Sequence, residues 1–319
     1  MIQRLLLLIA AGLLAACARA PVVPVGAEGL PGSAELESVP FFAQRDYQCG
    51  PAALATMLTQ RGIVTSPEEL VDRVYLPERK GSLQVEMVAT ARAHELVVYR
   101  LAPRLEAVLA EVASGNPVLV LQNLAFDRWP QWHFAVVVGY DLARQEIVLR
   151  SGTTRRLVMG FRRFETSWAK ADRWAAVTVE PPMIPSTATE TGWLSAASDL
   201  EQTGHRQAAL QAYRASTARW PTGLSWFALA NARYALGNKA SAERALRTSI
   251  RHSASFAPSW FNLSQVMVER GCLAQASAAQ RCAARLAPGD RRFEAAPVVS
   301  GMADTASGTC KTLPECPVR

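Results

Sequence analysis

The residues best suited to chemistry are a glutamine and a cysteine at the start of a predicted helix. Gln44 lies five residues before Cys49, and the apolar residues after Cys49 recur at helical spacing until Gly62. The free amides and the dipole of a helix N-terminus stabilise negative charge, so this position predicts a nucleophilic thiolate with a lowered pKa. The side-chain amide of Gln44 can donate a hydrogen bond to an oxyanion that forms beside the sulfur.

His133 is the candidate partner for this cysteine. The chain contains four histidines, and only His133 opens a strongly apolar run directly after a loop. An isolated histidine is more often a structural imidazole, but the cysteine motif upstream favours a catalytic role. We predict that His133 takes the proton of the Cys49 thiol and later protonates the leaving group.

Two stretches resemble the motifs of the bacteriocin-processing (double-glycine leader) cysteine peptidases, a papain-like group. They are the strand that His133 opens and the string Phe42-x-Gln44-x-x-x-x-Cys49-Gly50-Pro51-Ala52-Ala53-Leu54. The resemblance covers residues 38–180. It implies an α+β papain-like cysteine peptidase domain that hydrolyses peptide bonds through a Cys-His thioester, without a cofactor. No Cys or His spacing typical of a zinc site occurs in the sequence, so we expect no metal.

The residue that orients the imidazole is where this sequence departs from that group, whose members usually carry an Asp or Asn on the next strand. A hairpin that turns at residues 141–145 would place His133 opposite residues 150–153, which include no carboxylate. We predict that Ser151 accepts from the imidazole, with Thr153, a backbone carbonyl and Asn123 as alternatives. A neutral residue stabilises an imidazolium less than a carboxylate does, so the sequence leaves open whether the domain turns over substrate.

The elements predicted around these residues follow an α+β order, with helices first and a mostly antiparallel sheet after them. A capping box at Ser66, followed by Pro67, opens a helix that runs to about Tyr75, and another helix begins at Ser82. Further helices are expected at residues 105–114 and 164–170, and strands at 97–101, 117–121, 133–140, 146–150, 155–159 and 174–180.

An internal repeat of 33 or 34 residues follows a proline-rich linker at residues 181–190. Three residue types keep this period: Trp193, Trp226 and Trp260; Gly204, Gly237 and Gly271; Ala209, Ala242 and Ala276. An early aromatic residue, a glycine at the inter-helix turn and a small residue in the second helix are typical of tetratricopeptide repeats. We therefore predict an all-α tetratricopeptide repeat domain at residues 191–290, whose concave face would hold an extended peptide or a protein partner.

The N-terminus has the pattern of a bacterial lipoprotein signal. A charged start and a short apolar run lead to the string Leu14-Ala15-Ala16-Cys17, which looks like a lipobox. We predict a signal peptide over residues 1–17, lipidation of Cys17 and a Pro/Gly-rich tether at 18–37; an ordinary signal peptide is the alternative. Because Ala18 follows the cysteine, the expected location is the cell envelope, on the periplasmic side of the outer membrane.

Four more cysteines fit a disulfide-forming compartment. Cys272 and Cys282 lie about 15 Å apart along one predicted helix, too far to bridge each other. Each should therefore pair with Cys310 or Cys316 in the C-terminal tail, residues 291–319, in an order that the sequence leaves open. The net charge of +7 is scattered without a Lys/Arg block, so we expect no nucleic-acid partner.

Three functions fit these features. The first is a lipid-anchored, exported cysteine peptidase that acts on a peptide or protein substrate. The second is an inactive peptidase-like module that scaffolds envelope proteins through its repeats, motivated by the missing carboxylate. The third keeps the thioester but transfers the acyl group to an amine. Double-glycine specificity is not carried over, because the sequence contains no transporter segment or nucleotide-binding motif.

Overall fold

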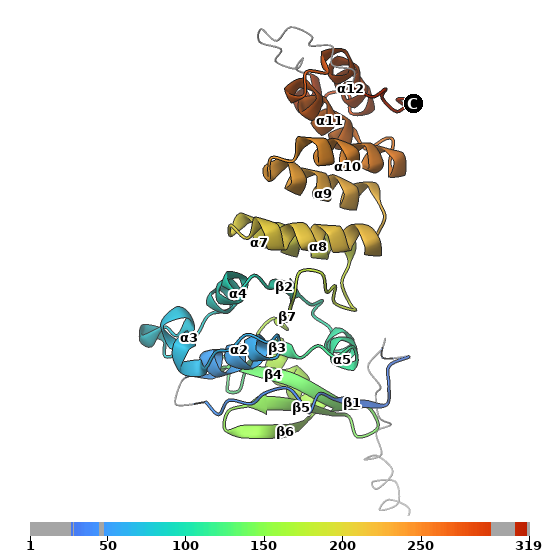
Figure 1. The fold of residues 1–319 in the computed structure, drawn as a ribbon. Coiled ribbons are helices and arrows are strands. Elements are labelled where there is room, and N and C mark those ends of the chain that lie inside the picture. The colour runs from blue at the N-terminus through green and yellow to red at the C-terminus, as the bar shows by residue number, and fades with distance from the viewer. Residues whose placement is uncertain (1–26, 28, 45–47, 295–309, 318–319) are drawn as a thin grey trace, which may run out of the picture.

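The computed structural model describes residues 27, 29–44, 48–294 and 310–317, and within them a wide α+β domain carries a tall column of paired helices (Figure 1). Seven strands form one sheet in the order β2-β7-β3-β4-β5-β6, with β1 beside β4, and every pairing is antiparallel. The strands are β1 (Ser33–Glu35), β2 (Val97–Arg100), β3 (Val118–Asn123), β4 (Trp132–Asp141), β5 (Glu146–Ser151), β6 (Thr154–Gly160) and β7 (Ala175–Val179). The predicted α+β order of helices first and an antiparallel sheet after them is confirmed.

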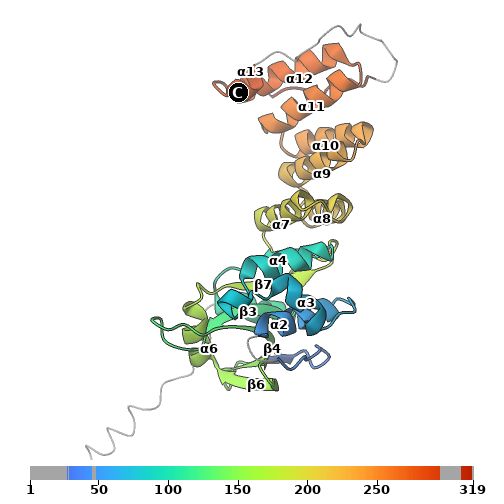
Figure 2. The same cartoon turned by 90° about the vertical axis from the view of Figure 1, so that its left-hand side faces the viewer.

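Helices cover both faces of this sheet, with α2 and α3 on one side and α6 on the other (Figure 2). They are α2 (Cys49–Thr59), α3 (Pro67–Val74), the short 3-10 helix η1 (Pro77–Arg79), α4 (Gln84–Ala93), α5 (Leu105–Ala113) and α6 (Phe161–Ala169). The capping box at Ser66 is present, because its hydroxyl accepts from the Glu69 amide and the Glu69 carboxylate accepts from the Ser66 amide.

The two central strands are buried on both faces, which explains why their sequences are almost continuously apolar. Alternate residues of β4 enter different cores. Phe134 and Val136 pack with Leu54 and Leu58 of α2, whereas Ala135 and Val137 pack on the side of α5 and α6. The sheet therefore separates the cysteine helix from the second helical layer.

The column consists of three antiparallel helix pairs that follow the 33 or 34 residue period. The helices are α7 (Glu190–Gln202), α8 (Arg206–Arg219), α9 (Gly223–Ala235), α10 (Lys239–His252), α11 (Ala257–Glu269) and α12 (Leu273–Leu286), followed by the short α13 (Arg291–Glu294). Gly204, Gly237 and Gly271 have positive φ just after α7, α9 and α11, a conformation that glycine adopts without strain. Trp193 and Trp260 are fully buried inside the pairs. The predicted all-α region is present, and its assignment as tetratricopeptide repeats remains a prediction.

The column does not stand apart from the sheet domain. Trp193, Leu194 and Leu200 of α7 belong to the same buried cluster as Val97 and Tyr99 of β2. The segment predicted as a linker, residues 181–190, is held down by Glu111 of α5, which is fully buried. Its Oε1 accepts from the Thr187 amide and hydroxyl, both at 2.7 Å, and from the Ser186 hydroxyl at 3.1 Å. The first helix pair is therefore fixed to the edge of the sheet.

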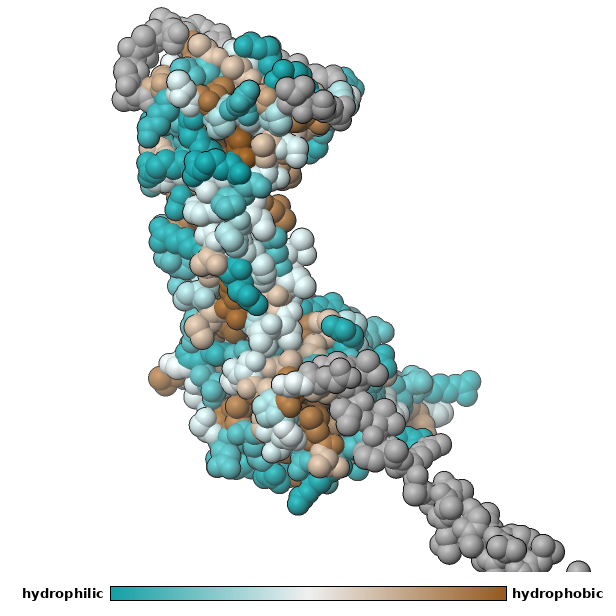
Figure 3. All heavy atoms as spheres, turned by 90° about the vertical axis from the view of Figure 1, so that its right-hand side faces the viewer, coloured by the Kyte–Doolittle hydropathy of each residue, from teal (hydrophilic) through white to brown (hydrophobic). Residues whose placement is uncertain are grey.

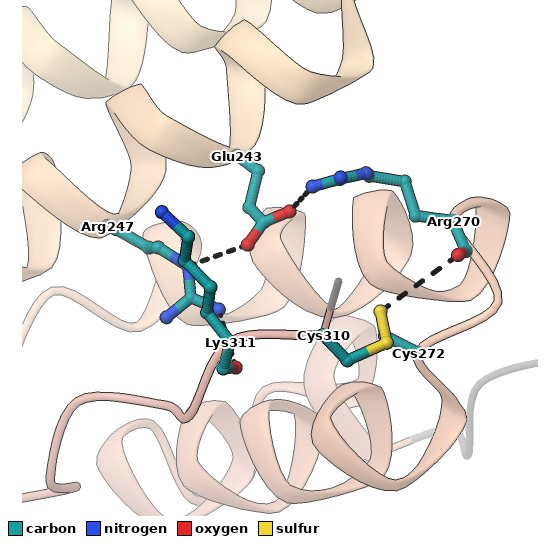
Figure 4. Close-up of a disulfide and its surroundings, with 6 residues drawn as sticks. All are labelled: Glu243, Arg247, Arg270, Cys272, Cys310 and Lys311. Carbon is teal, nitrogen blue, oxygen red and sulfur yellow. Dashed lines mark hydrogen bonds and ion pairs between the residues drawn. A yellow bond between two sulfur atoms is a disulfide. The ribbon is translucent and has the colours of Figure 1, made fainter. Parts of the chain in front are cut away.

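The C-terminal tail is stapled to the last helix pair by two disulfides, Cys272–Cys310 and Cys282–Cys316. The prediction that each helix cysteine pairs with a tail cysteine is confirmed, and the connectivity is now defined. Figure 4 shows the first bridge beside Glu243, which is 4% exposed and pairs with both Arg247 and Arg270. The guanidinium of Arg247 also donates to the carbonyls of Lys311 and Thr312, so the tail closes the end of the column.

The face of the column that lies on the right-hand side of Figure 1 carries mainly hydrophilic side chains, with small apolar areas between them (Figure 3). Among the residues that the structure describes, no helix is long and apolar enough to cross a bilayer.

We predict that Glu111→Gln lowers the free energy of unfolding by about 2–3 kcal/mol. The side-chain NH2 of the new glutamine would face groups that now donate to the Glu111 carboxylate. Hydrogen bonds to a charged acceptor contribute about 1.5–3 kcal/mol, so their loss accounts for the expected change. Guanidinium unfolding measures the change. Glu106→Gln, in the first turn of the same helix, is the matched control and should cost under about 1 kcal/mol. Equal small losses in both variants would contradict the anchoring role of Glu111.

Candidate active site

Cys49 is the first residue of α2 and is 8% exposed. No side chain of the described residues caps the first turn of this helix. Cys49 belongs to the same buried cluster as Phe134 of β4, and both residues line one cleft together with His133. Because Phe134 directly follows His133 in β4, this packing brings the predicted nucleophile close to the predicted base.

Gly50 is required at its position by close packing. A Cβ built on Gly50 would lie 2.1 Å from the Ser82 hydroxyl oxygen. Any side chain there would push away the segment that precedes α4. The Ser82 hydroxyl is buried and has no hydrogen-bond partner among the described residues.

The thiol of Cys49 is not activated by its position alone. Burial raises its pKa above the ordinary value, and the nearby backbone of Phe134, Gly50 and Cys49 opposes this shift without cancelling it. The sequence-based prediction of a lowered thiol pKa is therefore wrong, because removal from water outweighs the helix N-terminus at this site.

His133 is also buried, at 8% exposed, and burial lowers its pKa to about 4. The imidazole is therefore neutral at pH 7 and can accept a proton. Its Nε2 lies 2.8 Å from the hydroxyl oxygen of Ser151. When Nε2–H donates to Ser151, Nδ1 is left as the acceptor for the thiol proton. The site at rest pairs a neutral thiol with a neutral imidazole.

Strand register explains why Ser151 meets His133. The hairpin of β4 and β5 pairs Val136 with Arg150 and Val137 with Leu149, so Ser151 reaches the beginning of β4 on the face of His133. Asn123, the alternative orienting residue, is used elsewhere. Its side-chain oxygen accepts from the amides of Ala125 at 3.0 Å and Gln131 at 2.9 Å, which closes the loop between β3 and β4.

Gln44 lies beside the nucleophile on a segment that runs along the end of β5. The backbone N–H of Gln44 donates to the carbonyl of Gly152 at 3.1 Å, which leaves its side-chain amide out of this bond. A cleft of about 760 Å³ is lined by two chain segments and by the predicted site residues. Its lining comprises Gln44, Cys49, Arg79, Lys80, Gly81, Ser82, Leu83, Pro130, Gln131, Trp132, His133 and Phe134. A second, smaller hollow is lined by Cys49 together with Gln44 and Ser151. The four residues predicted from the sequence thus gather at one place.

Sequence reasoning missed Arg150, which supports this arrangement. It is 5% exposed and donates to the carbonyls of Val39 at 3.3 Å, Glu37 at 3.3 Å and Arg155 at 2.8 Å. These bonds hold the segment that leads to Gln44 against β5. The signal in the sequence was an arginine that directly follows the apolar run Ile147-Val148-Leu149.

The described residues contain no group of three or more His, Cys, Asp or Glu side chains placed to hold a metal ion. The chemistry of the cleft is that of a sulfur nucleophile, an imidazole and hydrogen-bond donors.

Residues 36–176 match the family model described as Peptidase_C39 like family, which spans the sheet domain but less than half of the chain. The resemblance that the cysteine and histidine motifs indicated is thereby confirmed for this region. None of the curated proteins matches the chain.

Three solved structures are similar to the chain at low identity. A putative C39-like peptidase from Bacillus anthracis shares 16% identity, with 47% of this chain and 98% of that chain covered and a TM-score of 0.40. The peptidase domain of Streptococcus ComA, a bifunctional ABC transporter of a quorum-sensing pathway, shares 17%, with 44% and 96% covered and a TM-score of 0.35. A double glycine motif protease from an AMS/PCAT transporter, in complex with the leader peptide, shares 17%, with 44% and 91% covered and a TM-score of 0.34.

We predict that the buried neutral state of His133 makes the fold sensitive to acid. The pKa of an unfolded histidine is near 6.5, so below that pH the unfolded chain binds a proton on this residue, whereas the folded chain binds it only near pH 4. The free energy of unfolding is therefore highest above pH 6.5 and falls as the pH drops toward 4, by at most about 3 kcal/mol.

Urea unfolding at pH 7, 5.5 and 4.5 tests this by comparing the wild type with His133→Gln, which should lose less stability on acidification. The exposed His252→Gln is the control and should behave like the wild type. An identical pH dependence in all three proteins would show that His133 is not held neutral.

Proposed function

We propose that this protein is a lipid-anchored, exported cysteine peptidase that hydrolyses peptide bonds. The observation that carries the proposal is the cluster at the cleft. Gln44, Cys49 and His133 line one cleft, and Nε2 of His133 lies 2.8 Å from the hydroxyl oxygen of Ser151. The match of residues 36–176 to the C39-like peptidase family supports the same reaction class.

In the proposed reaction, the sulfur of Cys49 attacks the carbonyl carbon of a peptide bond while His133 takes the thiol proton. The side-chain amide of Gln44 and the backbone N–H of Cys49 stabilise the oxyanion of the tetrahedral intermediate. His133 then gives its proton to the leaving amine as the C–N bond breaks, which leaves a thioester. A water molecule, deprotonated by His133, hydrolyses the thioester and restores the thiol.

The neutral resting pair determines how this reaction proceeds. No thiolate is stored beforehand, so the proton moves to His133 during the attack. Ser151 fixes the imidazole without adding negative charge, and it therefore stabilises the imidazolium less than a carboxylate would. We expect a slower enzyme than one that holds a preformed ion pair.

We propose that the rest of the chain anchors the peptidase domain to a membrane and brings a peptide or protein to it. The lipobox with Cys17 and most of the tether at 18–37 lie outside the described residues, so lipidation and the periplasmic side of the outer membrane remain proposals. Two disulfides fit an oxidising compartment. The helix pairs are proposed to be tetratricopeptide repeats that bring a peptide or protein partner to the domain.

The second candidate function is a peptidase-like scaffold without turnover. Two observations favour it: the raised pKa of the Cys49 thiol and the absence of a carboxylate among the described partners of His133. In that case the repeats would recruit an envelope protein whether or not Cys49 is present.

The first test of the peptidase is alkylation of Cys49 by iodoacetamide at pH 7 in protein that lacks residues 1–17. Because His133 accepts the thiol proton, we expect Cys49 to react at least five times faster in the wild type than in His133→Ala. Cys49 is the only free cysteine among the described residues, so mass spectrometry of the labelled peptide gives the rate directly.

Equal slow labelling in both proteins would contradict the base role of His133. Cleavage of a peptide pool by the wild type that is lost in Cys49→Ser would exclude the scaffold. A partner captured equally by both proteins, together with no cleavage, would favour it.

A further prediction concerns Ser151. Loss of one neutral hydrogen bond is worth about 1 kcal/mol, so Ser151→Ala should lower kcat/KM about fivefold. Ser151→Asp should move the acid limb of the pH profile upward from about 4, because a carboxylate favours the imidazolium. The neighbouring Thr153→Ala is the control and should leave kcat/KM and the profile unchanged. An unchanged profile in Ser151→Asp would show that Ser151 does not orient His133.

A further inference from the structure

The loop between β3 and β4 exposes an unusual concentration of large apolar side chains. Ten large hydrophobic residues are exposed in the described part of the chain, and four of them lie within residues 124–132, here called the aromatic loop. The exposed fractions are 46% for Leu124, 76% for Phe126, 73% for Trp129 and 50% for Trp132. Single exposed apolar residues need no explanation, but a contiguous group indicates a contact surface.

The aromatic loop is held in one conformation by its own hydrogen bonds. Asn123 accepts from two of its amides, as described above, and the amide of Leu124 donates to the carbonyl of Gln131 at 2.9 Å. The amide of Trp129 donates to the carbonyl of Phe126 at 3.1 Å, and Lys170 of α6 donates to the carbonyl of Ala125 at 2.7 Å. The aromatic side chains are therefore presented on a fixed support, which lowers the entropy lost on binding.

The aromatic loop continues into the cleft that holds the nucleophile. Its last three residues, Pro130, Gln131 and Trp132, line this cleft, and His133 follows at once. The other lining segment is Arg79–Leu83, which brings the positive charge of Arg79. No Asp or Glu occurs among the described residues that line the cleft. One lining segment thus belongs to the aromatic loop and the other carries Arg79, and they are called here the aromatic side and the basic side of the cleft.

We infer that this cleft selects polypeptides in which large apolar side chains lie close to acidic ones. The apolar side chains pack on Phe126, Trp129 and Trp132, and a carboxylate pairs with Arg79. A polypeptide fits better than a bilayer because the loop residues reach the cleft beside His133 and the second lining segment is charged. The inference deepens the proposed peptidase function by naming its substrate class.

Binding is tested without cleavage, in the full chain with Cys49→Ala. Four fluorescent twelve-residue peptides share a Gly/Ser/Ala background and carry three Phe with three Glu, three Ser with three Glu, three Phe with three Gln, or three Phe with three Lys. We expect the Phe/Glu peptide to bind at least tenfold more tightly than each of the others, as measured by fluorescence anisotropy. Similar affinities for all four peptides would overturn the inference.

Variants of the two sides then assign the contacts. Trp129→Ser and Phe126→Ser should each weaken binding of the Phe/Glu peptide at least fivefold and leave the Ser/Glu peptide unchanged. Arg79→Gln should remove most of the preference for Glu over Gln. Val64→Ser, at a position that is 97% exposed and does not line the cleft, is the matched control and should change neither. Variants that bind like the control would overturn the assignment.

A lipid surface is the competing occupant. Sedimentation with phosphatidylglycerol vesicles that is lost in Trp129→Ser, while peptide binding is unaffected, would overturn the inference in favour of a membrane contact. Cleavage by the protein with Cys49 intact is measured separately. Selective binding without cleavage would therefore reject the peptidase and keep the recognition surface, whereas cleavage without selectivity would do the opposite.

Discussion

The packing of helix α2 against strand β4 is the contact on which the site depends. Leu54 and Leu58 of the helix share a buried cluster with Phe134 and Val136 of the strand. A fully buried leucine contributes about 1.5–3 kcal/mol, so a few such residues hold the helix firmly. This packing brings Cys49 and Phe134 into one buried cluster, and His133, the sequence neighbour of Phe134, lines the same cleft as Cys49. The reacting groups meet because two apolar elements have to cover each other.

The same packing removes both groups from water. Burial costs little while the thiol and imidazole are neutral, and it penalises both once they are charged. The raised pKa of Cys49 and the lowered pKa of His133 are two results of one cause. A carboxylate beside the imidazole would compensate for this penalty, and Ser151 does not. Any charge that forms in this site during a reaction must therefore be stabilised by hydrogen bonds from Gln44 and the backbone.

Much of this site could be predicted from the sequence, because its geometry follows from local rules. The helix start at Cys49 and the strand opened by His133 are readable from apolar periodicity, and the turn near residue 143 set the hairpin register that leads to Ser151. The pKa of the thiol could not be read in this way. It depends on how deeply the first turn of α2 is covered, and chain segments far away in the sequence decide that.

Other features were hidden for the same reason. Two of the carbonyls that Arg150 binds, those of Glu37 and Val39, lie more than a hundred residues earlier in the sequence. Ser82 lies against Gly50, although the sequence pattern predicts their two segments as separate helices and gives no sign of this contact. The aromatic loop was visible in the sequence only as a loop, since exposure of its side chains is a property of the folded surface. Sequence patterns indicate which residues are available, and tertiary packing decides which of them act together.

Contacts of α4 and β2 attach the helical column to the domain that holds the cleft. This helix begins just after the cleft segment Arg79–Leu83 and reaches the first helix pair near its other end. There Arg92 pairs with Asp199 at 2.6 Å, and Glu95 lies 3.8 Å from His205. Together with the core shared by Val97 and Trp193, these contacts attach the first helix pair to the sheet domain.

A partner of the kind proposed for the helical column would therefore bind to the same packed body that holds the cleft. Contacts with the column and with the cleft could then add to one affinity, because the second contact is made within a complex that the first has already formed.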